Sequence, residues 1–297
     1  MTTSLNLPKL SYITASSFEE YQRLRPINKE LHCLMQDVEK TILYNYQDSN
    51  HFKLNGYCYV CGCFSDFSVN RNRNKEDNSL KTPNWRESLR CSHCGLNNRK
   101  RAALHIFLKE CSPSFESKIY LTEQVSPVYK YLANKFPSTY GSEYLKDKIP
   151  YGTKTDKGIV NESLTSLTFE DNDLDFVLSF DVLEHVPDYI KAFEECFRVL
   201  KPKGKLFFSV PFLINSQLNI IRAKVDDEGN IIHIKPAQYH GDPVNKKGIL
   251  CFQDFGWQML DQMRKIGFIN VKAIIYRSRF YGYLGSDHTI FVAQKSN

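Results

Sequence analysis

An α/β fold built around a parallel sheet is the architecture that this sequence predicts, and residues 173–211 carry the evidence. Residues 174–180 and 206–210 are short apolar runs rich in Val and Phe, which is typical of strands buried on both faces. Between them, four apolar side chains recur at steps of three, four and three, the spacing of one helix face: Ile190, Phe193, Phe197 and Leu200. Strand, helix and strand in one sheet imply parallel strands joined by a right-handed crossover.

Polar side chains follow the first of these strands directly. Asp181, Glu184 and His185 come just after the apolar run, and ligands of open α/β sheets bind beyond the carboxyl ends of the strands. An ordinary strand, helix and strand unit with a polar loop would also satisfy the hydrophobic pattern, but it does not require Leu-Glu-His at this point. We therefore expect the functional site here.

The segments FDVLEHVPD (residues 180–188) and FRVLKPKGKLFFSVP (197–211) resemble the fourth to fifth strands of the class I S-adenosylmethionine-dependent methyltransferases. The resemblance covers about residues 118–295. It implies a Rossmann-like seven-stranded sheet, S-adenosylmethionine as cofactor, and Phe180 and Asp181 at the cofactor site. Apolar runs at 271–276 and 289–293 suit the final pair of strands of this fold, the last of them antiparallel.

Composition places the chain among globular proteins. It has 297 residues, of which 42% are apolar and 24% charged, enough for one α/β domain and a smaller module. We see no apolar run of about 20 residues and no secretory signal, so we expect no membrane span and a cytoplasmic location. Nine cysteines are then expected to be reduced, buried or bound to metal.

We expect three regions along the chain. Residues 1–50 form an N-terminal helical segment, residues 51–110 a zinc-ribbon-like module, and residues 111–297 the methyltransferase domain with an insertion at about 212–247. In the first region, an apolar pattern at steps of three to five predicts one or two helices packed on a neighbour, with Pro26 as a break. The pattern consists of Leu24, Ile27, Leu31, Leu34, Val38 and Leu43.

Two CxxC pairs in the second region predict a metal site. Cys58 and Cys61, with Cys91 and Cys94, can bring four thiolates to the corners of a tetrahedron, because each pair spans one tight turn. Zinc is the expected metal, and four protein ligands make the site closed and structural. Iron and four unliganded thiols are the alternatives, and Cys63 or His93 can replace a neighbouring ligand.

The same region is basic, with eleven Lys and Arg against five Asp and Glu in residues 51–110. A run at 99–101 can contact RNA phosphates, or its arginines can pack on the protein surface. The segments WRESLRC (85–91) and CGLNNR (94–99) are similar to a ribbon that precedes some bacterial methyltransferases of polysaccharide and natural-product pathways. This resemblance favours a small-molecule or sugar acceptor, with nucleic acid as the weaker alternative.

Candidate cofactor residues follow the first two strands of the domain, expected at 118–122 and 138–141. The family places a glycine-rich turn after the first strand, whereas this chain has Glu123-Gln-Val-Ser-Pro. Glu123 is a candidate for the cofactor ammonium, and Glu143, twenty residues later, for the ribose hydroxyls. Ser163 aligns with the family aspartate that borders the adenine, and Glu162 is adjacent; either can bond the adenine amine.

The insertion supplies the candidate general base. A loop after the fifth strand can cover the substrate, and it contains His240 and Asp242. We expect His240 to remove the acceptor proton, with His185 as the second choice. His240 is equally consistent with a turn histidine that bonds its own backbone. After it, residues 251–267 predict an amphipathic helix.

The predicted function is methyl transfer from S-adenosylmethionine to an oxygen of a small molecule or sugar in a biosynthetic pathway. The alternatives are a non-catalytic binding module, which the missing glycine turn suggests, and an RNA methyltransferase. The choice between oxygen and nitrogen, the acceptor and the oligomeric state are left open by the sequence.

Overall fold

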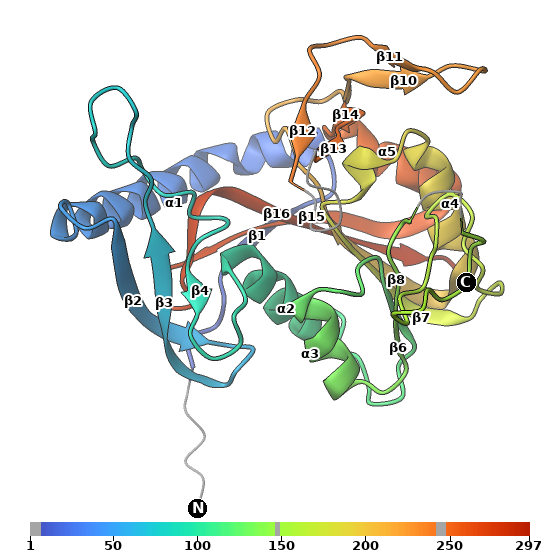
Figure 1. Ribbon diagram of the computed structural model, residues 1–297, viewed down its shortest axis with the longest axis horizontal. Coiled ribbons are helices and arrows are strands. Elements are labelled where there is room, and N and C mark those ends of the chain that lie inside the picture. Colours follow the sequence, from blue (N-terminus) through green and yellow to red (C-terminus); the bar gives the residue numbers. More distant parts are fainter. Residues whose placement is uncertain (1–6, 146–148, 242–247) are drawn as a thin grey trace, which may run out of the picture. The chain divides into compact units, whose positions relative to one another are not determined.

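The computed structural model describes residues 7–145, 149–241 and 248–297, and the chain divides into two compact units (Figure 1). Unit 1 comprises residues 7–14, Gln22–Ser112 and Ile274–His288, and unit 2 comprises Ala15–Tyr21, Pro113–Ala273 and Thr289–Asn297.

A seven-stranded mixed sheet runs in the order β1-β15-β16-β8-β7-β5-β6. Its strands are β1 (Tyr12–Ala15), β5 (Ile119–Leu121), β6 (Thr139–Gly141), β7 (Leu174–Phe180), β8 (Leu200–Ser209), β15 (Phe268–Ser278) and β16 (Tyr283–Lys295). Four strands, β6, β5, β7 and β8, are parallel, and β16 pairs antiparallel with β8. The predicted Rossmann-like sheet with an antiparallel last strand is confirmed.

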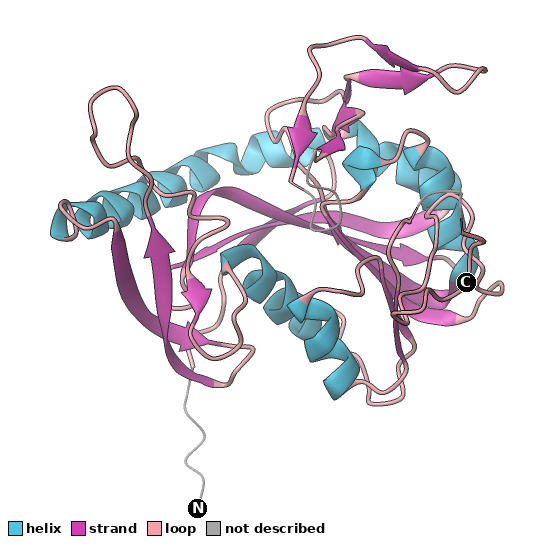
Figure 2. Ribbon diagram, in the orientation of Figure 1, coloured by secondary structure: helices cyan, strands magenta, loops and turns pink. Residues whose placement is uncertain are grey.

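The parallel strands create a switch point between β5 and β7. Helix α3 (Pro127–Lys135) leads from β5 to β6, and α4 (Tyr189–Val199) leads from β7 to β8 in the opposite direction along the sheet. Right-handed crossovers in opposite directions put the two helices on opposite faces, as the ribbon in Figure 2 shows. The crevice at the carboxyl ends of β5 and β7 is therefore where a ligand is expected.

The core of unit 2 explains the apolar runs in the sequence. Five of the seven side chains of β7 are buried in succession, and Leu206, Phe207 and Phe208 of β8 are fully buried. Helix α4 covers one face of these strands. Its Phe193 and Cys196 are buried, and it packs against β8 and α5 (Gln258–Ile266). Both faces of these strands are covered, as parallel strands require.

The insertion folds as three short antiparallel ladders. They are β9 (Ile220–Ile221) with β14 (Gln253–Asp254), β10 (Ala223–Val225) with β11 (Ile231–His233), and β12 (Tyr239–His240) with β13 (Ile249–Leu250). The β10–β11 hairpin, orange in Figure 1, projects beyond the other two ladders. The single-turn helix η1 (Leu183–His185) follows β7 and is bonded to this region, because Phe252 N–H donates to the Glu184 carbonyl at 2.8 Å.

Unit 1 contains most of α1 (Phe18–Asn45), the antiparallel sheet β2 (His51–Cys58), β3 (Cys63–Asn70) and β4 (Arg90–Cys91), and α2 (Asn98–Glu110). Leu54, Phe67, Val69, Trp85 and Leu284 belong to its buried core. Arg101 is fully buried here, with its guanidinium 3.7 Å from the Phe67 ring centroid and donating to three backbone carbonyls.

The predictions for two helices were partly wrong. Helix α1 continues through Pro26, and Ile27, Leu31 and Leu34 of the expected inner stripe are exposed; the buried side chains include Tyr21 and Asn28 instead.

The helix expected at 251–267 begins only at Gln258. Residues 253 and 254 pair with β9 instead, and this pairing places them in a strand. The helix ends as expected at Gly267, whose φ of 123° suits glycine alone.

Among the described residues between β6 and β7, isolated bridges but no strand are found. The seventh strand is β1, at the far edge of the sheet. No helix in the described ranges is both long enough and apolar enough to cross a membrane.

Candidate active site

Asp181 stands at the carboxyl end of β7 in a strained backbone conformation. Its φ is 55°, in the left-handed region that a side chain with a Cβ seldom adopts. The conformation is held by β8, because Asp181 N–H donates to the Ser209 carbonyl and the Ser209 hydroxyl donates to Asp181 Oδ1, both at 2.9 Å. Phe180, the last residue of β7, is 8% exposed. Strain of this kind clusters at ligand sites.

The loop after β5 is positioned by side chains in place of the glycine-rich turn. Glu143 Oε1 accepts backbone N–H groups of Gln124 at 2.7 Å and Val125 at 2.9 Å. The Gln124 amide in turn donates to the Gly158 carbonyl and accepts from Val160 N–H, so one side chain ties two loops together. Glu143 and the residues after Glu123 are thus brought together beyond the carboxyl ends of β5 and β6.

One glycine in this corner is required by close packing. A Cβ on Gly141, at the end of β6, would lie 2.6 Å from the Tyr129 ring and 3.2 Å from Gln124 Cα. The β5–α3 loop therefore approaches β6 through the space that Gly141 leaves open, and Ser126 caps α3 by accepting from Tyr129 N–H.

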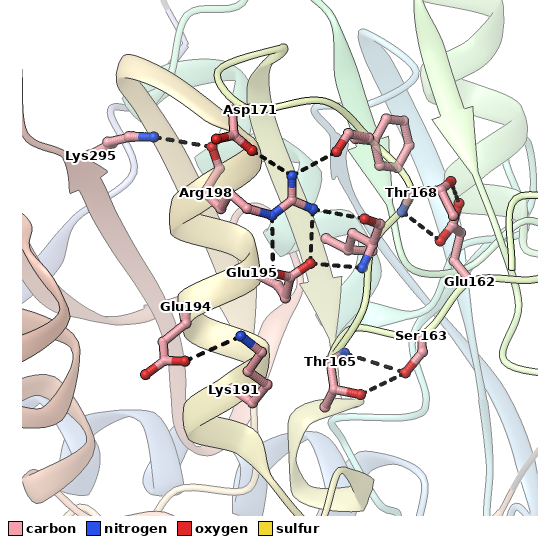
Figure 3. Close-up of polar contacts among 12 residues, drawn as sticks. Glu162, Ser163, Thr165, Thr168, Asp171, Lys191, Glu194, Glu195, Arg198 and Lys295 are labelled. Carbon is pink, nitrogen blue, oxygen red and sulfur yellow. Dashed lines mark hydrogen bonds and ion pairs between the residues drawn. The ribbon is translucent and has the colours of Figure 1, made fainter.

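Glu162 and Ser163, the candidates for the adenine amine, make local contacts (Figure 3). Glu162 is 4% exposed, and both its oxygens accept from Thr168, from the N–H at 3.2 Å and from the hydroxyl. Burial raises the pKa of Glu162, and the bonds from Thr168 oppose that effect. Ser163 Oγ lies 2.9 Å from Thr165 Oγ1.

The following loop is clamped to α4 by Arg198. Its guanidinium donates to the carbonyls of Leu167 and Phe169 and to the carboxylates of Asp171 and Glu195, at 2.8–3.0 Å (Figure 3). Glu195 also accepts from Leu167 N–H at 2.9 Å, and the bonds from Arg198 lower the pKa of Glu195. The border of the crevice is therefore anchored to the crossover helix.

His185 and His240 come together beyond β7. Their ring centroids are 5.2 Å apart and nearly perpendicular, although 55 positions separate them in the sequence. The buried Glu184 carboxylate lies beside both, with Oε1 3.7 Å from His185 Nε2 and 3.6 Å from His240 Nδ1. Cys251 joins them, its Sγ 3.9 Å from His185 Nδ1. Asp242, the third predicted catalytic residue, lies outside the described residues.

Electrostatics make Glu184 unusual. Its side chain is 0% exposed, and burial raises its pKa to about 7, while His240 acts in the opposite direction. Burial also raises the pKa of the Cys251 thiol to about 12, helped by the Glu184 charge. A carboxyl group that titrates near neutrality between two imidazoles can exchange protons with them.

The four predicted cysteine ligands also converge, in unit 1. The sulfur atoms of Cys58, Cys61, Cys91 and Cys94 all lie within 4.8 Å of one another, with Cys58 to Cys94 at 3.9 Å and Cys61 to Cys91 at 3.8 Å. Ligands of a tetrahedral ion with Zn–S bonds of about 2.3 Å are about 3.8 Å apart. The cluster is therefore compatible with zinc.

Two glycines shape the cysteine turns. Gly62 and Gly95 have φ of 70°, and their N–H groups donate to the carbonyls of Cys58 and Cys91, at 2.9 and 3.0 Å. Cys63 is not part of the cluster, and His93 Nδ1 lies 3.1 Å from Ser65 Oγ. Of the basic run, Arg101 is buried and Arg99 Nε donates to Glu87 at 2.6 Å. The buried arginine cannot reach a phosphate.

Three residues of these sites were not among the sequence candidates. Gln124, Glu184 and Cys251 acquire their roles through partners distant in sequence, which no local motif encodes. Glu184 was noted as a marker of the site without a role. Cys251 was assigned to a helix that the structure starts seven residues later.

Comparison with known proteins agrees with the fold. Residues 127–208 match a family model described as a methyltransferase domain. An uncharacterized protein of Methanocaldococcus jannaschii is 39% identical over 71 residues, 24% of this chain and 29% of the relative, so the match spans less than a third of that protein. Demethylmenaquinone methyltransferase of Anoxybacillus flavithermus is 26% identical over 188 residues, 57% of this chain and 72% of the relative.

Among solved structures, an S-adenosylmethionine-dependent methyltransferase of Mesorhizobium loti aligns with a TM-score of 0.41 at 17% identity, covering 65% of this chain and 98% of its own.

The strand order, with its switch point between β5 and β7, is that of the Rossmann-like methyltransferase fold. Within this fold, residues 127–208 match a methyltransferase domain.

Proposed function

We propose that this protein transfers a methyl group from S-adenosylmethionine to a hydroxyl oxygen of a small molecule or sugar. The observation that carries the proposal is the cluster of His185, His240 and the buried Glu184, assembled beyond the carboxyl end of β7. A hydroxyl nucleophile needs a proton acceptor, whereas many amines are nucleophilic without one. A group of proton acceptors beside the cofactor crevice therefore favours oxygen as the methylated atom.

The residues of the crevice fit the cofactor. Glu143 uses only Oε1 in its bonds to the β5–α3 loop, so the carboxylate has a second oxygen with which to accept the ribose hydroxyls. The N-terminus of α3 favours the cofactor carboxylate, and Glu123 its ammonium. Phe180 and Asp181 lie at the carboxyl end of β7, the strand that pairs with β5. On the adenine side, Ser163 is the better candidate, since both Glu162 oxygens already bind Thr168.

The bound cofactor would supply a sulfonium methyl that is electrophilic toward oxygen. The protein then has to align the nucleophile with that methyl group, a contribution of up to about 7 to 11 kcal/mol in ideal cases. The insertion that carries His240 on β12 is bonded to η1 through Phe252 and Gln253, so it holds this histidine over the end of β7. His240 is the proposed general base, with His185 next to it.

We propose zinc for the four cysteines. Their sulfur separations suit a tetrahedral ion, and four protein ligands leave no open position. The metal would stabilise the turns at Gly62 and Gly95 and play no part in the transfer.

Titration calorimetry with S-adenosylhomocysteine tests cofactor binding. We expect saturable binding below millimolar concentration; no detectable heat at millimolar ligand would leave the non-catalytic binding module as the better proposal. A candidate acceptor incubated with protein and cofactor should gain about 14 Da, the mass of one added CH₂.

The base assignment has its own test. His240→Ala should lower kcat with a hydroxyl acceptor by about 10²-fold or more and leave S-adenosylhomocysteine affinity unchanged. His233→Ala is the matched control, because His233 is an exposed histidine of the same insertion. Full turnover by His240→Ala at saturating cofactor would reject His240 as the base.

A further inference from the structure

Three metal-binding side chains of unit 2 converge, in addition to the four cysteines of unit 1. One ligand atom each of His185, His240 and Cys251 lies within 4.8 Å of the others. The three residues come from η1, from β12 and from the position after β13. We propose that they bind a divalent transition metal ion such as zinc or cobalt(II).

The hydrogen bonds of His185 orient the ring as in known metal sites. Its Nδ1 lies 2.8 Å from the Leu250 carbonyl, so this nitrogen carries the proton and donates it. Nε2, 3.7 Å from Glu184 Oε1, is then the nitrogen with a lone pair for an ion, and the Cys251 thiol, now 3.9 Å from Nδ1 of the same ring, would turn toward it on binding. Metal-bound histidines commonly donate their other ring N–H to a backbone carbonyl in this way.

His240 is oriented by a second contact. Its Nε2 lies 3.2 Å from the amide nitrogen of Gln238, and Nδ1 faces Glu184 at 3.6 Å. An amide group can present either its oxygen or its nitrogen to a ring nitrogen. With the amide oxygen turned toward Nε2–H, Nδ1 becomes the ligand atom, and both imidazoles direct a lone pair to the region beside the Glu184 carboxylate.

Glu184 provides an independent observation that favours a cation. Both its carboxylate oxygens are buried, and neither has a donor within hydrogen-bond distance among the described residues. A buried carboxylate without donors is costly, and the cost falls when a positive charge lies nearby. A divalent ion beside one carboxylate and one thiolate would leave the cluster neutral.

The cluster is held in place before any ion binds. The Gln253 amide donates to the carbonyls of Leu183 and Val186 at 2.7 and 3.0 Å, which fixes the segment after Cys251 against η1. His240 pairs with Ile249 in the β12–β13 ladder. The three donors therefore sit on backbone that is already cross-linked, which reduces the entropy lost when an ion is bound.

The donor set selects the metal. Two imidazole nitrogens and one thiolate suit borderline and soft ions, whereas magnesium and calcium prefer oxygen ligands. Three protein ligands leave a fourth position for water or an acceptor hydroxyl, as in catalytic zinc sites. A hydroxyl bound there would lose its proton to water more readily, so with the ion bound no histidine base would be needed; this last role rests on the proposed function, whereas metal binding does not.

Metal content tests the site. Each protein is loaded with zinc, desalted and analysed by plasma mass spectrometry. Wild type should contain one more equivalent of zinc than Cys251→Ser or His240→Ala. His233→Ala, the exposed histidine on β11, should keep the wild-type content. Equal zinc content in wild type and in both ligand variants would overturn the proposal. The zinc bound by the four cysteines of unit 1 is the same in all three proteins and does not affect this comparison.

Cobalt(II) provides a second readout. Wild type should show more thiolate-to-cobalt absorption than Cys251→Ser, and circular dichroism should show that both proteins are folded. His240→Ala, altered at a side chain that is 31% exposed, covers the case in which Cys251→Ser does not fold. A folded Cys251→Ser variant with the same cobalt spectrum as wild type would count against the metal site. If the extra ion binds but methyl transfer fails, only the proposed function is rejected.

Discussion

Gly141 shows how one residue can decide the shape of the cofactor crevice. Gly141→Ala would place a methyl group 2.6 Å from the Tyr129 ring and 3.2 Å from Gln124 Cα, and the second of these is backbone that cannot easily move. We expect the free energy of unfolding to fall by about 1–3 kcal/mol and S-adenosylhomocysteine to bind more weakly. Chemical denaturation and calorimetry measure the two effects.

Gly241→Ala is the control for this change. A Cβ on Gly241 meets no atom of the described residues within 4 Å, and its φ is not in the left-handed region. If Gly141→Ala matched the control in both stability and affinity, the close approach of the β5–α3 loop to β6 would not matter for binding.

Individual residues were predictable where a local pattern encodes their role. The CxxC spacing predicts that the four cysteines lie together, and the position of His185 after β7 predicts that it lies near the site. The sequence marks Glu184 as part of the site but does not show that it is buried between two histidines, and it assigns Cys251 to a helix. Their significance arises only when the chain returns from the insertion and brings residue 251 against residue 185.

At the scale of elements, Arg198 joins α4 to the loop at 167–171. Arg198→Ala would remove donors from two carbonyls and two carboxylates (Figure 3). We expect a loss of about 1–3 kcal/mol in the free energy of unfolding, since bonds to charged groups are the stronger ones but this side chain is partly exposed. Thermal or urea denaturation provides the measurement.

Lys191→Ala, on the same helix, is the comparison for Arg198. Lys191 pairs with Glu194 at 3.6 Å, and both side chains are about half exposed, so its loss should cost less than about 0.5 kcal/mol. Similar effects of the two substitutions would mean that Arg198 contributes no more than a surface ion pair.

Elements were predicted best where the hydrophobic period and the burial agree. Strands β7 and β8 contain their apolar runs, because both faces of the strands are covered. In α4, Phe193 of the expected stripe is buried, whereas Ile190 and Phe197 are partly buried and Leu200 already belongs to β8. In α1 the pattern was misleading, since Leu31 and Leu34 are exposed although they recur at helical spacing. Spacing identifies a helix, but which side of it is buried depends on the tertiary neighbours.

At the scale of the whole molecule, the four cysteines are expected to stabilise unit 1. Cys61→Ser should remove one zinc equivalent and lower the melting temperature, because structural zinc contributes directly to folding. Hydrogen exchange should accelerate in β2 and β4, which end at Cys58 and Cys91, and in β3, which pairs with both.

Cys63→Ser tests the ligand choice in the same hairpin. Cys63 is outside the cluster, so its substitution should leave the zinc content unchanged and alter stability by no more than about 0.5 kcal/mol. Loss of zinc in Cys63→Ser, with retention in Cys61→Ser, would reverse the assignment.

Stability as a function of pH reflects two buried histidines of unit 1. Burial lowers the pKa of His105 to about 3, with Lys109 adding to the effect, and lowers that of His288 to about 4, with Arg86 and Arg277 adding to it and Asp287 and the Leu284 carbonyl opposing it. His105 stacks on Tyr59 at 3.7 Å between centroids, and His288 Nε2 lies 2.7 Å from that carbonyl. Both rings are therefore neutral in the folded protein at moderately acidic pH.

The direction of the pH effect follows from the unfolded chain. Below about pH 6.5 an unfolded histidine takes up a proton that the folded protein excludes, so the free energy of unfolding rises with pH up to about 6.5 and then levels off. Each histidine contributes a slope of up to about 1.4 kcal/mol per pH unit between its folded and unfolded pKa values.

His105→Phe retains an aromatic ring against Tyr59 but cannot be protonated, so urea denaturation between about pH 4.5 and 7 should give it a shallower slope than wild type. Because the carboxylates of the chain titrate equally in both proteins, the difference in slope isolates this histidine. Parallel curves for the two proteins would show that His105 is not excluded from protonation by burial.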